Sequence, residues 1–207
     1  MNDKIREFFE HHEGRRKDVY KDSRGFRTVG IGHLLDHEQS PDELSVLGCR
    51  QNEVHLIISV NDAQIDGLFD IDYMEACDDA RVIFGDQFET FSEVRQTVIV
   101  SQCFQLGFTG FRKFKNMIAA MKAEDWERAA RESLDSRAAR QTPERWKQQA
   151  DMLKYNTWDG NPKTSDASQE SDISVADLQA SLSTLSARVE ALEKQVFNQK
   201  KRPPFSP

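Results

Sequence analysis

Two carboxylic acids and a hydroxyl lie close together near the start of the chain. Glu13 follows an amphipathic stretch, Asp22 opens a turn, and Thr28 comes just after that turn. Glycoside hydrolysis needs one carboxylic acid that protonates the leaving oxygen and a second group that steers water or attacks from the opposite face of the sugar. Glu13 and Asp22 are candidates for these roles. Their spacing alone is weak support, because 35 of the 207 residues are acidic and most acidic pairs are solvated surface groups.

The sequence pattern also indicates the elements that must position these residues. Apolar residues recur at helical spacing behind Asn2 and Asp3, which predicts a short helix that ends near Gly14. The strand-like residues 19–21 and 26–29 flank turn-forming residues 22–25, which predicts a β-hairpin. The glycines at positions 30 and 32 indicate a close approach of the backbone to another part of the chain.

Most of the following chain has a helical pattern. Helical spacing of apolar residues extends over residues 41–158, with predicted helices over 63–80 and 94–105. The predicted fold class is therefore α+β and mainly helical, with a small N-terminal β-sheet. Three separated cysteines without a CxxC pair are predicted to be buried free thiols: Cys49, Cys77 and Cys103.

The composition excludes several classes of protein. No stretch approaches the roughly 18 apolar residues of a membrane span, so none is expected. The net charge of −7 argues against a general nucleic-acid-binding protein. Charged residues occur throughout the first fourteen positions, so we expect synthesis in the cytoplasm without a signal peptide.

The C-terminal part of the chain differs from the rest. Residues 160–172 are rich in Ser, Asp and turn formers, which predicts a flexible linker after a globular domain over residues 1–159. Residues 173–199 repeat apolar residues at alternating spacings of three and four, which predicts a coiled-coil oligomerisation helix, and residues 200–207 form a basic, proline-containing tail. The seam consists of Val175, Leu178, Leu182, Leu185, Val189, Leu192 and Val196.

The oligomeric state of this helix has three alternatives. Residues 188–193 resemble the Arg-apolar-x-x-apolar-Glu signature of parallel trimeric coiled coils, so a homotrimer is expected. Valine at three of the four a positions and leucine at every d position leave a dimer open. The third alternative is a single amphipathic helix that docks on its own domain, although such a helix usually has a wider apolar stripe.

The residues around the candidate acids resemble the active-site stretch of the phage-type lysozymes, the family of the bacteriophage T4 enzyme. The matching motifs are residues 13–15 (EGR), 20–22 (YKD), 25–26 (GF) and 28–35 (TVGIGHLL). Further matches are residues 104–107 (FQLG), 125–127 (DWE), 141–143 (QTP) and 157–159 (TWD). The resemblance covers residues 1–159 and implies two lobes joined by a long helix.

The resemblance also implies a reaction. The family cleaves the β-1,4 bond between N-acetylmuramic acid and N-acetylglucosamine in peptidoglycan, with inversion at the anomeric carbon. Glu13 would be the proton donor, Asp22 the second carboxylate and Thr28 the hydroxyl that helps to position the attacking water. Inversion requires space for that water between the two carboxylates.

Two supporting pairs follow from the resemblance. Arg145 stands at the position that pairs with the catalytic acid, where it would favour the carboxylate form of Glu13, although the reaction needs the protonated form. We hypothesise that Arg145 orients Glu13 in the free enzyme and that bound substrate weakens the contact. His33 is implied to pair with Asp72 on the linking helix and to contribute to stability.

Other positions concern the substrate and cofactors. Leu34 and Phe104 match substrate-contacting positions at the two lips of the cleft. Met117 and Glu132 stand where the family has polar substrate-side residues, which puts those contacts in doubt. Because residues 1–50 and 101–150 carry the cleft residues and are together net positive, we expect an electropositive glycan-facing surface. No cofactor is expected, and no metal, since the five histidines have no HExxH or CxxC companion.

The biological role has alternatives. The expected function is a peptidoglycan hydrolase acting on glycan strands, carried on a phage virion for wall penetration, since a threefold tail or baseplate would explain a trimeric anchor and provide partner proteins. The first alternative is a soluble endolysin that waits in the host cytoplasm for a holin. The second is a catalytically silent trimeric protein that only binds the wall.

Overall fold

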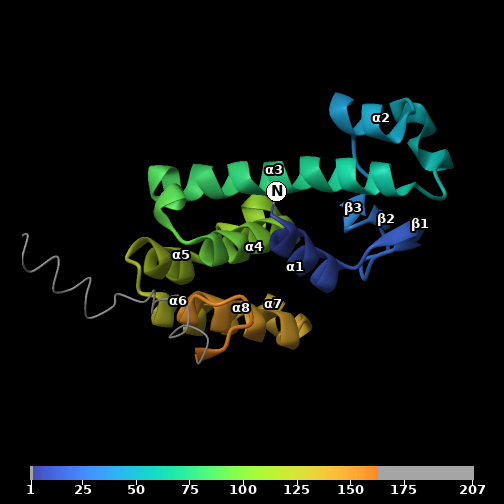
Figure 1. Cartoon of the computed structure of the whole chain (residues 1–207). Coiled ribbons are helices and arrows are strands. Elements are labelled where there is room, and N and C mark those ends of the chain that lie inside the picture. The colour runs from blue at the N-terminus through green and yellow to red at the C-terminus, as the bar shows by residue number, and fades with distance from the viewer. Residues whose placement is uncertain (1, 163–207) are drawn as a thin grey trace, which may run out of the picture. The chain divides into compact units, whose positions relative to one another are not determined.

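The computed structural model describes residues 2–162, which belong to one compact unit (Figure 1). The first elements are α1 (Asp3–Glu13), β1 (Arg16–Lys21), β2 (Arg27–Gly30), β3 (His33–Leu34), α2 (Pro41–Leu47) and the 3-10 helix η1 (Gln51–Leu56). The later elements are α3 (Asp62–Phe84), the 3-10 helix η2 (Gly85–Thr90), α4 (Glu93–Phe111), α5 (Lys115–Lys122), α6 (Trp126–Leu134), α7 (Arg137–Gln141) and α8 (Pro143–Tyr155). The predicted fold class is confirmed: the structure is mainly helical, with one small antiparallel sheet near the N-terminus.

Helix α1 has the bounds that its sequence predicts. The Asn2 side chain accepts a hydrogen bond from the backbone N–H of Lys4 and caps the first turn. The apolar face of the helix, which includes Phe8 and Phe9, is buried against the rest of the unit. Gly14 ends the helix with a φ of +78°, a conformation that favours glycine.

The small sheet follows directly and has the strand order β1-β2-β3. Tyr20 pairs with Thr28, and Thr28 pairs with Leu34, so these three residues form one row across the sheet. The hairpin is as predicted, but β1 starts at Arg16 and is longer than the predicted strand. Strand β3 was not predicted, because two residues are too few to show an alternation.

Helix α3 is the long element of the fold. Its N-terminus has a capping box in which Asn61 and Gln64 satisfy each other's backbone N–H groups. With 23 residues the helix is roughly 34 Å long at about 1.5 Å per residue. Figure 1 shows the sheet and α2 at its N-terminal end and α4 and α5 along its C-terminal half. The helix thus links the two parts of the described unit that the sequence led us to expect.

Helix α4 forms much of the core of the second part. Val98, Ile99 and Val100 are almost fully buried, which explains why this stretch of the sequence is so apolar. Gly107 has the non-helical φ of 65° inside the helix and kinks it, two residues beyond the predicted end at residue 105. Helix α8 packs against α6 and contributes Trp146, which is fully buried and stacks on Phe114.

Several further expectations have clear outcomes. Cys77 and Cys103 are buried free thiols, but Cys49 is only half-buried, so that part of the prediction is wrong. Cys49 lies just after the C-cap of α2, where the chain is less covered. No helix among residues 2–162 is long and apolar enough to cross a membrane. The coiled coil predicted over 173–199, the tail over 200–207 and the linker beyond residue 162 lie outside the described residues.

Candidate active site

Glu13 is the last residue of α1 and is held by an arginine from α8. Arg145 Nη1 donates a hydrogen bond to Glu13 Oε1 at 2.6 Å. The same guanidinium donates to the backbone carbonyl of His12. Both side chains are largely covered, with 18% of Glu13 and 12% of Arg145 exposed. Burial, with the charges of Arg145 and His11, lowers the pKa of His12 to about 4, so its ring is neutral beside this pair at neutral pH.

Asp22 is built into the hairpin turn between β1 and β2. Its Oδ1 accepts hydrogen bonds from the backbone N–H groups of Arg24 and Phe26, both at 2.8 Å. Its Oδ2 lies 3.4 Å from Arg24 Nε. Partial desolvation opposes these contacts, but the donors from Phe26 and Arg24 together lower the pKa of Asp22 below its ordinary value. Asp22 is therefore a fixed carboxylate at neutral pH, which suits a group that positions water.

Thr28 lies on β2 and is almost completely buried. Its hydroxyl donates to the carbonyl of Phe26 at 3.2 Å. Tyr20, its partner on β1, has a raised pKa, first because of burial and then because of the negative charges of Glu13 and Asp22, with Arg16 opposing them. Both candidate carboxylates therefore raise the pKa of the same tyrosine.

Gly32 lies between Glu13 and a phenylalanine from α4. It has a φ of +81°, and a Cβ at this position would lie 3.4 Å from Phe104 Cε1 and 3.6 Å from Glu13 Oε2. The close backbone approach expected from the glycine pattern is therefore present. Glycine is favoured here by the left-handed backbone, whereas a Cβ would be in ordinary van der Waals contact with Phe104 and Glu13.

We expect Gly32→Ala to reduce both stability and wall-degrading activity. The strained backbone should cost about 1–2 kcal/mol. Because the Cβ position lies 3.6 Å from Glu13 Oε2, the backbone adjustment that relieves the strain should disturb the candidate acid. The measurements are thermal unfolding and the initial rate of peptidoglycan solubilisation. Gly48→Ala is the control, since Gly48 also has a positive φ but has no atom within 4 Å of its Cβ position. Equal losses of activity in the two variants would show that the position of Gly32 beside Glu13 does not matter for activity.

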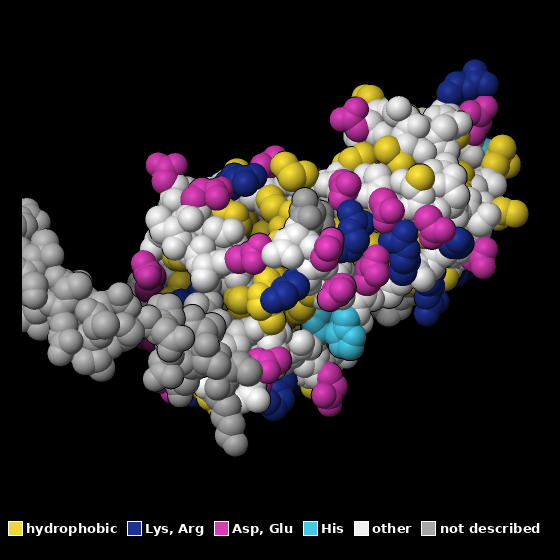
Figure 2. All heavy atoms as spheres, in the orientation of Figure 1, with side chains coloured by type: hydrophobic (Ala, Val, Ile, Leu, Met, Phe, Trp, Pro, Cys, Tyr) yellow, Lys and Arg dark blue, Asp and Glu magenta, His cyan; other side chains and the backbone are white. Residues whose placement is uncertain are grey.

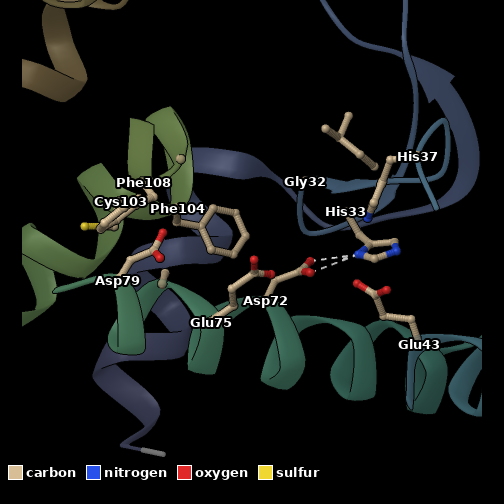
Figure 3. Close-up of a pocket in the computed structure, with 13 residues that line it drawn as sticks. Gly32, His33, His37, Glu43, Asp72, Glu75, Asp79, Cys103, Phe104 and Phe108 are labelled. Atoms are coloured by element: carbon tan, nitrogen blue, oxygen red, sulfur yellow. Dashed lines mark hydrogen bonds and ion pairs between the residues drawn. The ribbon is translucent and has the colours of Figure 1, made fainter. Parts of the chain in front are cut away.

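Next to Gly32 lies a pocket of about 310 Å³ between β3, α3 and α4, here called the cleft pocket. Leu34 and Phe104 both line it, as do Phe108 and Gly107 from the kinked end of α4. Figure 3 shows Phe104 on one side and His33 on the other, with acidic side chains of α3 between them. The two residues expected at the lips of the cleft thus face one cavity.

The lining of the cleft pocket is acidic, which corrects one expectation from the sequence. Asp72, Glu75 and Asp79 lie on one face of α3 and line the pocket together with Glu43. Burial raises the pKa of Glu75, and the nearby carboxylates raise it further against the opposing charge of His37. The expectation of an electropositive surface is wrong at this pocket. Helix α3 belongs to the acidic block of residues 51–100, and its carboxylates line the pocket.

His33 forms a buried polar cluster at the edge of the same pocket. Its Nδ1 lies 2.9 Å from Asp72 Oδ2, and its Nε2 lies 2.8 Å from Gln39 Oε1. Burial alone would lower the pKa of His33, but the hydrogen bond and charge of Asp72, then Gln39 and Glu43, raise it above its ordinary value. His33 and Asp72 are thus in the contact that the resemblance implied, while Gln39 was not foreseen.

The ligand atoms of His33, Glu43 and Asp72 lie within 4.8 Å of one another, close enough to be considered as a metal site. Both ring nitrogens of His33 already face acceptors, and a Glu43 oxygen accepts from the backbone N–H of Ser40. A metal would have to displace one of these contacts, so a structural cluster explains the arrangement better. The absence of a metal remains a prediction.

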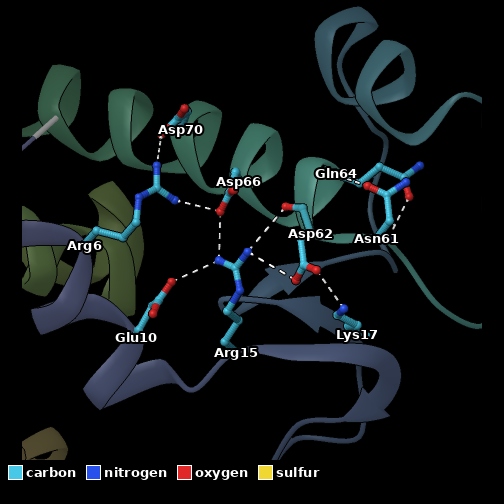
Figure 4. Close-up of polar contacts among 9 residues, drawn as sticks. All are labelled: Arg6, Glu10, Arg15, Lys17, Asn61, Asp62, Gln64, Asp66 and Asp70. Carbon is cyan, nitrogen blue, oxygen red and sulfur yellow. Dashed lines mark hydrogen bonds and ion pairs between the residues drawn. The ribbon is translucent and has the colours of Figure 1, made fainter. Parts of the chain in front are cut away.

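A network of ion pairs fixes α1 to α3 behind the site. Arg15 Nη1 lies 2.9 Å from Glu10 and 2.8 Å from Asp66, and Arg6 contacts both Asp66 and Asp70 (Figure 4). Figure 2 shows blue and magenta side chains alternating on this face of the molecule. The network holds the helix that ends in Glu13.

Met117 and Glu132 do not line the cleft pocket. Both line a separate pocket of about 330 Å³, together with Lys113 and Ser136. Met117 is almost completely buried, and Glu132 Oε1 lies 3.9 Å from Arg128 Nε. At this pocket the chain therefore has a buried thioether and a carboxylate at the two positions where the family was expected to have polar substrate-side residues.

Comparison with known proteins agrees with this geometry. The family described as phage lysozyme matches residues 10–146. The chain belongs to the phage lysozyme family. The matched residues include the helix end that carries Glu13, the hairpin, the cleft pocket and Arg145.

Relatives of this phage lysozyme domain include a phage spike protein and two probable lysozymes. The pre-baseplate central spike protein Gp5 of Enterobacteria phage T4 is 30% identical over 148 residues, which are 68% of this chain and 26% of that protein. The chain thus spans about a quarter of the spike protein. Probable T4-type lysozymes 1 and 2 of Dictyostelium discoideum are each 23% identical, over 70% of this chain and 90% of theirs.

Proposed function

We propose that this chain is a peptidoglycan hydrolase that cleaves the β-1,4 bond between N-acetylmuramic acid and N-acetylglucosamine. The observation that carries the proposal is the placement of Glu13 at a helix end, covered and paired with Arg145, beside a hairpin that fixes Asp22 as a carboxylate. Membership of the phage lysozyme family supports it. One protonated and one ionised carboxyl group are what hydrolysis of a glycosidic bond requires.

In the proposed mechanism, glycan enters beside Leu34 and Phe104 and excludes water from Glu13. The contact with Arg145 weakens, and protonated Glu13 gives its proton to the leaving oxygen as the glycosidic bond breaks. Asp22 and Thr28 hold a water molecule on the opposite face of the sugar. This water attacks the anomeric carbon and passes a proton to Asp22, which inverts the anomeric configuration.

The test is product analysis of purified peptidoglycan digested by the full chain. New reducing ends on muramic acid in soluble muropeptides, identified by mass spectrometry, would support the proposed bond. Reducing ends on glucosamine would contradict it. Binding to the wall without any release would favour the silent, wall-binding alternative.

We further propose that the lysozyme is carried on a virion, on the tail or baseplate. The relation to a T4 baseplate spike protein supports this role, as does the predicted trimeric coiled coil. A soluble endolysin is the alternative, and the match to 90% of the length of each Dictyostelium lysozyme shows that the domain also makes up most of some proteins.

The predicted homotrimer gives this second proposal a direct test. We expect light scattering of the full chain to give about three times the 23.8 kDa mass of one chain. Replacing Leu182 and Leu185 with glutamate should reduce the mass to that of a monomer, since charges in a coiled-coil seam are strongly unfavourable. A monomeric wild-type chain would contradict the trimer and remove its support for the virion role.

A further inference from the structure

Phe108 separates the cleft pocket from a second concavity, here called the α5 groove. The groove has a volume of about 510 Å³ and lies between α3, α4 and α5. Helix α5 lines it with Lys115, Ile118, Ala119 and Lys122. These residues follow the spacing i, i+3, i+4, i+7, so they form a single continuous face of the helix.

The floor of the groove is apolar and open to solvent. Val82 of α3 is 72% exposed. Ile83 and Phe108, which complete the floor with Ile118, are half-buried. A concave apolar surface of this volume is within the range of binding sites rather than of ordinary surface roughness.

The groove is also positively charged on a chain of net charge −7. Arg112, Lys115 and Lys122 line it, and no acidic side chain does. Within the part of the chain that the structure describes, these three cations form no ion pair; Arg112 lies over the Phe108 ring and Lys122 over Phe84. Lys147 and Lys154 of α8, in contrast, are paired with carboxylates.

We propose that the α5 groove is a docking site for an acidic amphipathic helix of a partner protein. Charge complementarity is the first argument, because cations at both ends of α5 enclose an apolar centre. The second argument is the arrangement of the lining, since residues of three helices border one open apolar space against which a further helix can pack. The site is distinct from the cleft pocket and does not depend on the proposed hydrolysis.

The probe is a synthetic, fluorescently labelled peptide of about 18 residues. It has leucines at i, i+3, i+4 and i+7 and glutamates on both sides of this stripe. The control peptide has the same composition with the helical spacing scrambled. Anisotropy is measured against the full-length protein at low and high salt, and sedimentation with vesicles of phosphatidylglycerol and phosphatidylcholine is measured in parallel.

Variants locate the binding surface. We expect Lys115→Glu and Lys122→Glu each to weaken peptide binding about fivefold or more, and Val82→Ser to weaken it comparably. Lys4→Glu is the matched control, because it makes the same change of charge on an exposed lysine of α1 and should leave binding unchanged. All four variants should unfold thermally at close to the wild-type temperature, which verifies their folding independently of the proposed hydrolysis.

Saturable, salt-sensitive binding of the ordered peptide that is lost in the groove variants supports the proposal. Absence of binding, equal binding of the scrambled peptide, or equal binding by the groove variants overturns it. Binding of anionic vesicles through the same residues without binding of the peptide also overturns it and identifies a lipid-binding surface instead.

Discussion

Glu13→Gln is expected to reduce the rate of peptidoglycan cleavage by at least about 100-fold, the range in which general acids contribute. Glutamine keeps the size of the side chain and can still contact Arg145, but it has no proton to give to the leaving oxygen. The measurement is the initial rate of release of soluble muropeptides. Thermal unfolding of the variant should remain close to that of the wild type.

Glu10→Gln is the matched control for this experiment. Glu10 lies one turn earlier on the same helix and pairs with Arg15 rather than with Arg145. Its loss should change the rate by no more than about twofold, since this half-buried ion pair does not contact Glu13 or Asp22. A folded Glu13→Gln protein with nearly wild-type activity would show that the acid is another residue.

Asp72→Asn is expected to have the largest effect on stability. It leaves the buried ring of His33, of which 2% is exposed, without its charged partner. Removal of one member of a buried pair typically costs about 3 kcal/mol or more. We expect a loss of this size in the free energy of unfolding at pH 5, measured by urea denaturation.

The pH dependence identifies the cause of that loss. Because the pKa of folded His33 is raised above its ordinary value of 6.5, the pair contributes its full stability below about pH 6.5. That contribution disappears as the pH rises through the folded pKa and the ring becomes neutral. The difference between wild type and Asp72→Asn should therefore be much smaller at pH 9 than at pH 5.

Asp70→Asn provides the control for this pH dependence. Asp70 lies on the same helix, is 56% exposed and pairs with Arg6. We expect it to lose less than about 1 kcal/mol at either pH. An equal loss at pH 5 and pH 9 in Asp72→Asn would show that the charge on His33 is not the source of the stability.

The parts of the fold that follow a local period were predictable from the sequence. The cap at Asn2, the apolar face of α1 and the glycine that ends it specify that helix without any tertiary information. The hairpin follows in the same way from its turn residues. Strand β3 was missed because its two residues are fixed by their pairing with β2, which is not a local property.

The candidate site was predictable only where a motif marked it. Glu13 and Asp22 were candidates from their residue types and positions, but their spacing alone was weak support. The resemblance strengthened them and was the source of Arg145. Gln39, Glu75 and Asp79 were missed because their roles depend on how α3 lies across the sheet and α4. The period of three and four that places Asp72, Glu75 and Asp79 on one face is visible in the sequence, but the cavity that this face borders is not.

Glu13 lies where helix α1 is tied both to α3 and to α8. Arg6 and Arg15 tie α1 to α3, whereas Arg145 reaches Glu13 from α8, which packs with α6 in the other part of the molecule. Any hinge movement that carries α8 away from α1 must first release the carboxylate from its guanidinium. This ion pair therefore joins the two parts of the molecule, and its removal is expected to let them separate more readily.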